Sequence, residues 1–179
     1  MCLPIWGVEL VAAAQQRGLP VTASVTWLHL LGSTAILNSY DTSWRLDPPL
    51  GNEVDRLALV AGVKSGVIGA IAIDHYAHSY EDKKVGFGEA PVGSIGLELA
   101  LPVLWENLVL PGYLTALDLW RGLSCGSAAC CGLSAPQELV LFDPTVKWVA
   151  NSQNLRSKSA NTPWFDQVIS GKVEILAIN

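Results

Sequence analysis

The feature that most constrains the fold is a wholly apolar run, Val67–Ile73, which stops abruptly at Asp74. A strand with one face in water alternates apolar and polar residues, whereas this run has no polar position. It is also much shorter than the roughly 18 apolar residues that cross a bilayer. Such a segment is typical of a strand buried on both faces, as in a parallel sheet covered by helices.

The residues before this run alternate between helical and strand-like patterns. Helix, strand, loop, helix, strand is the order of a parallel α/β protein, in which functional side chains collect at the carboxyl ends of strands. The expected elements are a helix over Gly7–Gly18, a strand over Val21–Trp27, a loop over Asn38–Asn52, a helix over Glu53–Lys64 and a strand over Val67–Ile73.

The composition changes near Gly132, and the tail is rich in β-formers. The pattern predicts two domains, residues 1–131 with the α/β alternation and residues 132–179 as a small β-rich subdomain. The further elements expected are a loop over Ser79–Gly93, helical material over Ile95–Leu123, strands over Glu138–Phe142 and Val146–Ala150 joined by a turn at Asp143-Pro144, and a strand or pair over Val168–Ile178 broken at Gly171.

The bulk composition excludes several classes of protein. Half of the 179 residues are hydrophobic and 15% are charged, yet polar residues interrupt every apolar tract before it could span a membrane. Glu9 follows the start too closely for a signal peptide. The net charge of −5 argues against nucleic-acid binding. Adjacent Cys130 and Cys131 form no C-x-x-C, and we expect them to be small buried residues of a cytoplasmic protein.

The segment after the apolar strand gathers the residues that could carry chemistry. Asp74, His75 and His78 lie within five positions, and they include two of the three histidines of the chain. A carboxylate at the mouth of a barrel can bind a divalent metal or act as a general base, and a nearby histidine can bind an anion. The alternative is a loop with an exposed histidine and a capping aspartate. The spacing alone leaves both interpretations open.

The run Ile73–Trp105, IDHYAHSYEDKKVGFGEAPVGSIGLELALPVLW, closely resembles the strand-eight segment of dihydroorotases, metal-dependent cyclic amide hydrolases of the amidohydrolase superfamily. That family carries Asp-His-x-x-His there, then Glu-x-Lys, Ala-Pro-x-Gly and Gly-Leu-Glu. The sequence of this run is most similar to that of the cyanobacterial type of the family. Further similar segments follow in one register: GVELVAAA at Gly7–Ala14, VTASVTWLHLL at Val21–Leu31, YDTSWRLDPPLGNEVDRLALVAGVKSG at Tyr40–Gly66, LVLFDP at Leu139–Pro144 and SKSANTPW at Ser157–Trp164.

The resemblance implies an α/β fold, the last three βα units of a (β/α)8 barrel with part of a small C-terminal β subdomain. It also implies roles. Asp74 matches the aspartate that binds one metal ion, zinc in this family, and that moves the proton of the attacking hydroxide to the departing nitrogen. His78 matches a histidine that helps to hold the substrate carboxylate. The loop Ala90–Gly93, with Pro91 and Gly93, matches the one whose main chain touches the substrate.

The two remaining histidines and the tryptophans are expected to be supporting residues. His29 follows the expected strand over Val21–Trp27 and is assigned a structural role. His75, next to Asp74, is expected to donate a supporting hydrogen bond. Four tryptophans are taken as packing residues because each is large enough to dominate local burial: Trp27, Trp44, Trp105 and Trp120.

Two departures from the family pattern bear on activity. The other metal ligands of the family belong to upstream segments that this sequence does not contain, and a catalytic zinc needs about three protein ligands. Asp47 stands where the family usually has an asparagine before the Pro-Pro pair, and a carboxylate there would repel an anionic ligand. We therefore expect a truncated chain or one part of a split protein that is inactive alone.

Three functional hypotheses follow from the resemblance. The first is a dihydroorotase-family polypeptide of pyrimidine biosynthesis, which interconverts N-carbamoyl-L-aspartate and dihydroorotate and whose partner would be the missing barrel half. The second is a non-catalytic structural partner of aspartate carbamoyltransferase. The third is a relative of hydantoinases or allantoinases. The Glu-x-Lys spacing at Glu81–Lys83 and the LDPPLG loop at Leu46–Gly51 favour the first over the third.

Overall fold

The computed structural model describes residues 5–134 and 139–176 and divides the chain into two compact units that interleave along the sequence. We call unit 1 the residues Met1–Ala35, Leu50–Ala72 and Asn107–Gln137. Unit 2 comprises Ile36–Pro49, Ile73–Glu106 and Glu138–Asn179. The two domains expected from the sequence are consecutive, with a boundary between residues 131 and 132, and this boundary stays a prediction.

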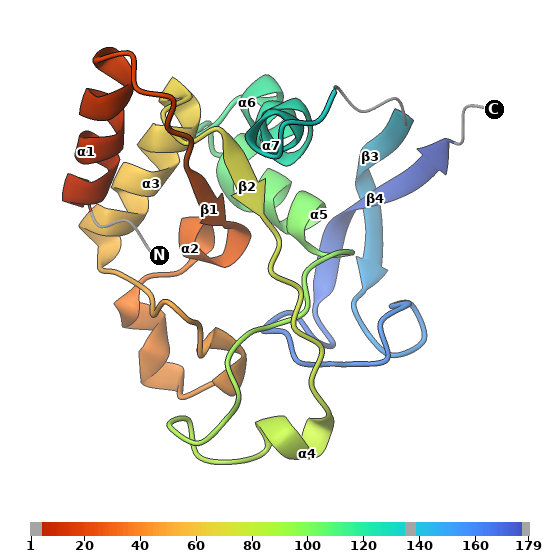
Figure 1. The fold of residues 1–179 in the computed structure, drawn as a ribbon. Coiled ribbons are helices and arrows are strands. Elements are labelled where there is room, and N and C mark those ends of the chain that lie inside the picture. The colour runs from red at the N-terminus through yellow and green to blue at the C-terminus, as the bar shows by residue number, and fades with distance from the viewer. Residues whose placement is uncertain (1–4, 135–138, 177–179) are drawn as a thin grey trace. The chain divides into compact units, whose positions relative to one another are not determined.

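Unit 1 is a layer of helices around two short parallel strands. Strand β1 pairs with β2 in the register Ser24↔Ala70, Val25↔Ile71 and Thr26↔Ala72. Figure 1 shows β1 beside β2, and α1 beside α3. The elements are α1 (Ile5–Gln16), β1 (Ser24–Thr26), α2 (Trp27–Leu31), α3 (Glu53–Ser65), β2 (Ala70–Ala72), α6 (Ala116–Leu123) and α7 (Cys125–Cys130).

Local sequence signals account for the ends of helix α3. Asn52 accepts a hydrogen bond from Asp55 N, and the Asp55 carboxylate accepts one from Asn52 N, so the two form a capping box. This box satisfies backbone N–H groups that have no partner within the first turn. At the other end Gly66 adopts φ 80°, the left-handed conformation that commonly closes a helix. The predicted helix Glu53–Lys64 is confirmed.

The apolar run identified in the sequence lies in the core of unit 1. Ile68 and Ile71 are almost fully buried, and the glycines of the covering helices allow a close approach. A Cβ on Gly126 would lie 2.0 Å from Gly69 O, and one on Gly122 would lie 2.8 Å from the Ile71 side chain. Burial on both faces is confirmed, although the hydrogen-bonded strand is shorter than Val67–Ile73.

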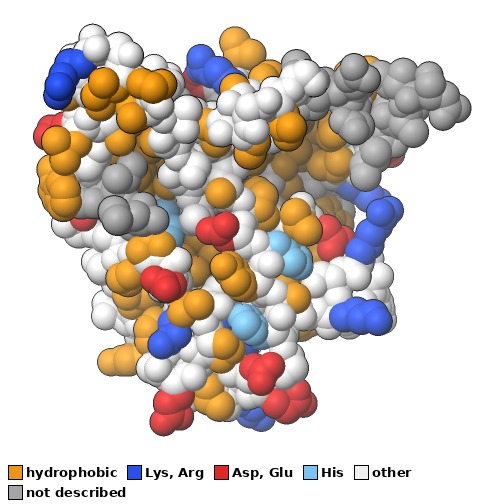
Figure 2. Space-filling view, viewed as in Figure 1, with side chains coloured by type: hydrophobic (Ala, Val, Ile, Leu, Met, Phe, Trp, Pro, Cys, Tyr) orange, Lys and Arg blue, Asp and Glu red, His pale blue; other side chains and the backbone are white. Residues whose placement is uncertain are grey.

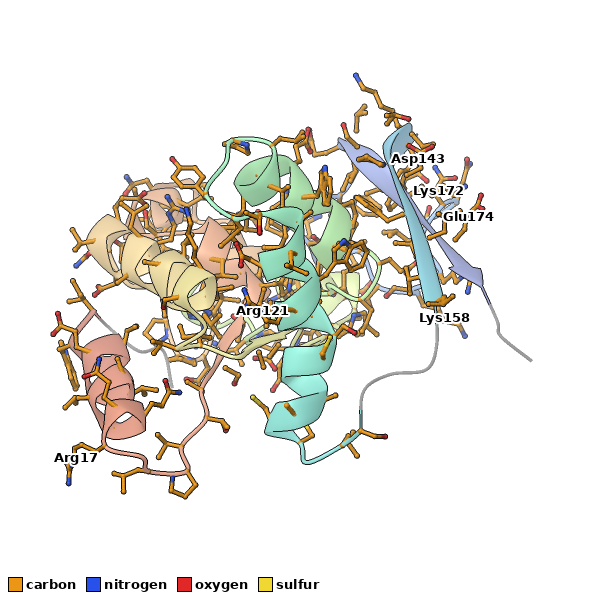
Figure 3. All side chains as sticks on the ribbon, turned by 90° about the horizontal axis from the view of Figure 1, so that it is seen from above. Arg17, Arg121, Asp143, Lys158, Lys172 and Glu174 are labelled. Carbon is orange, nitrogen blue, oxygen red and sulfur yellow. The ribbon has the colours of Figure 1, made fainter. Side chains whose placement is uncertain are left out.

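Unit 2 consists of long loops, short helical turns and an antiparallel ribbon. Figure 1 shows α4 on an extended loop and α5 near the ribbon of β3 and β4. Asp143, Lys172 and Glu174 belong to this ribbon (Figure 3). The elements that begin in this unit are η2 (Thr42–Trp44), α4 (Tyr80–Lys83), α5 (Ala100–Leu104), η3, a π-helical turn (Trp105–Val109), β3 (Leu139–Val149) and β4 (Val168–Leu176), while the 3-10 helix η1 (Thr34–Ser39) begins in unit 1.

The turn predicted at Asp143-Pro144 is wrong. Strand β3 runs through it, and the register with β4 shifts between Asp143 and Lys147. Asp143 Oδ1 accepts hydrogen bonds from Thr145 N and Thr145 Oγ1, so the Asx-type signal makes a bulge inside one strand. Strand β4 likewise continues through Gly171, at φ 111°, where a Cβ would lie 2.5 Å from the Phe142 ring. The ends expected at Glu138 and Ile178 lie outside the described residues.

Other sequence-based expectations also need correction. The segment predicted as a loop over Ser79–Gly93 contains helix α4, and the helical stretch over Ile95–Leu123 is broken between Val109 and Ala116. The expected strand Val21–Trp27 is ordered as a strand only over Ser24–Thr26, because α2 begins at Trp27. Cys131 is exposed and Cys130 is half-buried, so the prediction that both are buried is wrong.

The fold class is confirmed at the level of a mixed α/β chain. The described residues contain two parallel strands and one antiparallel ribbon, which do not close into a barrel. No helix among the described residues is long and apolar enough to span a bilayer.

Candidate functional site

All five candidate site residues lie in the sequence segments of unit 2: Asp47, Asp74, His78, Pro91 and Gly93. Asp74 stands two residues beyond the end of β2 and is exposed. Its φ of 45° is in the left-handed region, which aspartate tolerates better than most residues. The side chain therefore follows a strand end, as predicted, and is open to solvent.

His75 is held by the backbone of the segment before α5. Its Nδ1 accepts hydrogen bonds from Gly96 N at 3.2 Å and from Leu97 N at 3.3 Å. A ring nitrogen that accepts from amides carries no proton, so the neutral ring has its N–H at Nε2. His75 also forms a parallel bridge with Ser94, which continues the direction of the chain beyond β2. The ring is thus held by two bonds that it accepts at Nδ1, and the supporting donation expected of His75 stays a prediction.

His78 is joined to the Ala90–Gly93 loop. Its Nε2 lies 2.8 Å from Val92 O, and since a carbonyl only accepts, Nε2 carries the proton. The ring stacks on Tyr76 with a centroid distance of 6.5 Å and an interplanar angle of 6°. To donate to a carboxylate ligand as well, an imidazole bonded in this way would use Nδ1. The structure therefore brings together two of the motifs found in the sequence.

Gly93 is required by close packing and by its backbone conformation. Its φ is 101°, and a Cβ there would lie 2.5 Å from Tyr76 Cβ. Gly93 N donates to Arg45 O at 2.8 Å, and Arg45 Nη2 donates to Gly88 O at 3.1 Å. The loop that holds Asp47, itself exposed, is thereby tied through Arg45 to the loop that holds Gly93.

Lys83, the lysine of the Glu-x-Lys motif, ties the same loops together from within. Its side chain is buried, and Nζ donates to Thr42 O at 3.0 Å and to Pro91 O at 2.7 Å. Thr42 Oγ1 donates in return to Lys83 O at 2.9 Å. Burial lowers the pKa of the ammonium group below its ordinary value; nearby Asp41 opposes this shift and Arg45 adds to it. Lys83 is a structural clamp that the sequence pattern alone did not assign.

Asn161 is a second polar residue that sequence reasoning missed. It is 6% exposed, and its side chain contacts three backbone groups. Nδ2 donates to Tyr76 O at 2.8 Å and to Gly93 O at 3.3 Å, while Oδ1 accepts from His78 N at 3.2 Å. Its own carbonyl accepts from Ser94 Oγ and Ile95 N. The one signal for it was its place in the SKSANTPW segment.

Glu98, the glutamate of the Gly-Leu-Glu motif, holds the segment that leads to Asn161. Its carboxylate accepts hydrogen bonds from Arg156 N at 2.9 Å and from Ser157 N at 3.0 Å. Two backbone donors on one carboxylate fix the start of the 156–161 segment. The motif therefore has a structural explanation within this chain.

His29 lies in unit 1 and is 3% exposed within helix α2. Its Nδ1 and Thr26 Oγ1 are hydrogen-bonded. Trp27 and Trp44 are also buried, as a packing role requires. These positions agree with the structural role predicted for His29 and with the packing role predicted for these two tryptophans.

The described residues do not by themselves fit a metal ion. Among them, no group of three or more His, Cys, Asp or Glu side chains is placed to hold one. Asp74 could supply a single oxygen ligand, whereas a catalytic zinc takes about three protein ligands.

No protein-family model matches the chain. Curated proteins do match over nearly its whole length. A probable dihydroorotase-like protein of Synechocystis sp. is 47% identical over 176 residues, which is 93% of this chain and 40% of that protein. A dihydroorotase of Caldanaerobacter subterraneus is 35% identical over 173 residues, 93% of this chain and 40% of the enzyme.

Solved structures show the same fold at lower identity. An L-hydantoinase (dihydropyrimidinase) of Arthrobacter aurescens superposes with a TM-score of 0.84 at 22% identity, over 97% of this chain and 42% of that one. A dihydropyrimidinase of Brevibacillus agri gives 0.82 at 20% identity, over 98% and 42%. The chain thus spans about 40% of the length of the curated relatives that it matches.

Proposed function

The recognition of a partial dihydroorotase-like amidohydrolase in this sequence is confirmed, and we propose that unit 2 carries the strand-eight part of its site. Asp74 is the catalytic carboxylate of that site and would be one of its zinc ligands. His78, Pro91 and Gly93 form the binding site for the substrate carboxylate. The charge of Asp47 influences which substrate binds there. The substrate is dihydroorotate or N-carbamoyl-L-aspartate, and the location is cytoplasmic.

The observation that carries this proposal is the hydrogen bond between His78 Nε2 and Val92 O, at 2.8 Å. It joins the Asp-His-x-x-His segment to the Ala-Pro-x-Gly loop, two segments that the resemblance assigns to one substrate. Lys83 and Arg45 tie the loop of Asp47 to the same place. The candidate binding residues therefore belong to segments that are bonded to one another.

The division of labour among these residues follows from their contacts. His78 offers a ring whose orientation is fixed at Nε2, so a bound carboxylate would meet Nδ1. Gly93 N is already bonded to Arg45 O, so Gly93 acts through the shape of the loop. Asp74, exposed at the strand end, can accept and return a proton as a general base.

We further propose that β1 and β2 are the last two strands of a (β/α)8 barrel and that this chain alone does not turn over substrate. A metal supplies the attacking nucleophile in such hydrolases, and Asp74 is the one family ligand that the matched positions provide. For turnover, this proposal requires the barrel segments of the relatives that this chain does not span.

Ligand binding tests the proposal directly. N-carbamoyl-L-aspartate added to the ¹⁵N-labelled chain should shift the amide signals of His78 and Gly93, and His78→Gln should weaken binding about tenfold, the factor for one lost charge-assisted hydrogen bond of about 1.4 kcal/mol. Glu81→Gln, at an exposed position of α4, is the control and should bind as the parent chain does. Shifts produced by a hydantoin ring but not by N-carbamoyl-L-aspartate would transfer the site to the hydantoinase hypothesis.

Catalysis and metal content test the second part. Purified chain should hydrolyse no dihydroorotate and hold no stoichiometric zinc, while a full-length dihydroorotase assayed beside it does both. Turnover by the chain alone would refute the inactive interpretation. Co-purification with aspartate carbamoyltransferase, together with an absence of ligand binding, would favour the structural-partner hypothesis instead.

A further inference from the structure

We infer that Asn161 is a positioning residue: its amide holds the His78 segment and the Val92–Gly93 loop at the separation that lets His78 Nε2 bond to Val92 O. The inference rests on the proposed function, because it concerns the same substrate-binding histidine. It adds a residue from a distant part of the sequence, 83 positions beyond His78.

The first step is the set of bonds that Asn161 makes. Its amide oxygen accepts from His78 N, while its amide nitrogen donates to Tyr76 O and to Gly93 O. One planar group therefore contacts the main chain on both sides of the His78–Val92 bond. An amide is suited to this place because it combines an acceptor with two donors, and no other uncharged side chain except glutamine does.

The second step is that the two segments approach unusually closely at this point. A Cβ on Gly93 would lie 2.5 Å from Tyr76 Cβ, so only glycine lets the loop pass. The bond that the Gly93 carbonyl accepts here is buried and the one that the Tyr76 carbonyl accepts is partly buried, and carbonyls withdrawn from water need donors. Asn161 supplies a donor to each of them.

The third step is that Asn161 is itself held in place. It is 6% exposed, and its own carbonyl accepts from Ser94 Oγ at 2.7 Å and from Ile95 N at 3.1 Å. Ser94 is fully buried. Glu98 binds the backbone of Arg156 and Ser157 just before it. The amide is thus fixed by its own chain and can transmit that position to His78.

The test replaces the donating NH2 group of the Asn161 side chain by an accepting oxygen, with little change in side-chain shape. Asn161→Asp keeps the oxygen that faces His78 N and loses the donors to Tyr76 O and Gly93 O. Asn154→Asp is the matched control, since Asn154 in the same unit also donates to a backbone carbonyl, Val149 O, at 2.9 Å, but is exposed. Both variants lose side-chain donation, and only one should affect His78.

The readout is the ring N–H signal of His78 in a ¹H–¹⁵N spectrum of the ligand-free full chain, assigned by its loss in His78→Gln. A bonded imidazole N–H exchanges slowly with water. Asn161→Asp should raise the exchange rate of this proton about tenfold, the factor for one hydrogen bond of about 1.4 kcal/mol, whereas Asn154→Asp should leave it unchanged. A purely structural role of Asn161 would lower the melting temperature without moving this signal.

An unchanged signal in folded Asn161→Asp would overturn the inference. If that variant does not fold, Asn161→Ser gives the same answer, because its single short hydroxyl cannot reach both carbonyls: faster exchange supports the inference and an unchanged rate overturns it. The measurement uses no ligand, so failure of N-carbamoyl-L-aspartate to bind the parent chain would refute the proposed function while leaving this result intact.

Discussion

The two units of this molecule are stabilised in different ways. In unit 1, helices α3 and α6 begin with capping boxes, and apolar side chains such as Trp27, Leu30 and Ile68 are almost fully buried. In unit 2 the loops that hold the candidate residues are tied by polar side chains bonded to the backbone, notably Lys83, Asn161 and Glu98.

This difference teaches where a candidate site can be read from a sequence. Apolar packing tolerates substitution when volume and pattern are kept. Its signal is therefore shared by many residues in a periodic pattern, which a sequence shows directly. A side chain that bonds two backbone segments is a single residue without periodicity. The candidate residues lie in the second kind of region, where their geometry depends on a few polar contacts.

The largest effect is expected from the core of unit 1. Leu119 in α6 is fully buried, and Leu119→Ala should lower the free energy of unfolding by about 3 kcal/mol, measured by urea denaturation. Leu117 in the same helix is 73% exposed, and Leu117→Ala should change stability by less than about 0.5 kcal/mol. Equal losses for the two variants would mean that α6 does not pack as described.

A smaller effect is expected from the polar clamp of unit 2. Lys83→Met keeps most of the side-chain volume but leaves the Thr42 and Pro91 carbonyls without this donor, so unfolding should become easier by about 2 kcal/mol. Lys84→Met, at the exposed neighbouring position, should be nearly neutral. If Lys84→Met were the more damaging change, the account of unit 2 as a region held by Lys83 would be wrong.

The stability difference between the parent chain and Lys83→Met should also depend on pH. Burial lowers the pKa of Lys83 below 10.5, so the folded chain holds this proton less tightly than the unfolded chain. The resulting penalty is fully present below the lowered pKa and is relieved as the pH rises toward 10.5. The stability gap between the parent chain and Lys83→Met should therefore widen from pH 7 to pH 10. A gap that narrows would contradict the assignment.

The smallest effect is expected at the cap of α6. Thr115 and Asp118 form a capping box. Thr115→Ala should therefore lower the free energy of unfolding by about 1 kcal/mol at pH 7. The Thr115 hydroxyl is the main cause that lowers the pKa of Asp118 below 3.8, with Thr115 N and Arg121 adding to it. This stabilisation is present above pH 3.8 and is lost as the pH falls through the lowered pKa. The difference in unfolding free energy between the parent chain and Thr115→Ala should therefore shrink as the pH falls in an acid denaturation experiment. A difference that stays constant with pH would exclude a contribution from the pKa of Asp118.

The parts predicted from sequence follow the same division. Helices α1 and α3 have apolar periodicity and a glycine beyond the end, so both were predicted with ends within about two residues. The strand β3 was mistaken for a hairpin because Asp-Pro favours a turn in isolation, and only pairing with β4 on both sides of the bulge shows otherwise. The exposure of Cys131 depends on packing that composition does not encode.

The candidate site was predictable through its motifs and not through its geometry. The resemblance identifies Asp74, His78 and Gly93, but it does not predict the backbone hydrogen bonds that His78 and Gly93 make. Asn161 was not found, since one asparagine in a loop carries no period and no charge. Its role becomes visible only in the structure, where its side chain accepts a hydrogen bond from His78 N, 83 positions earlier in the sequence.

Hydrogen exchange of backbone amides tests the central claim that the loops of the candidate site in unit 2 are held together by hydrogen bonds between distant segments, and not by regular helices. The amides of His78, Gly93 and Ile95 lie outside regular helices and donate to Asn161 Oδ1, Arg45 O and Asn161 O respectively. The account predicts that they exchange about as slowly as the Leu59 and Val60 amides within α3. Exchange as fast as that of an unstructured peptide at all three positions would contradict it.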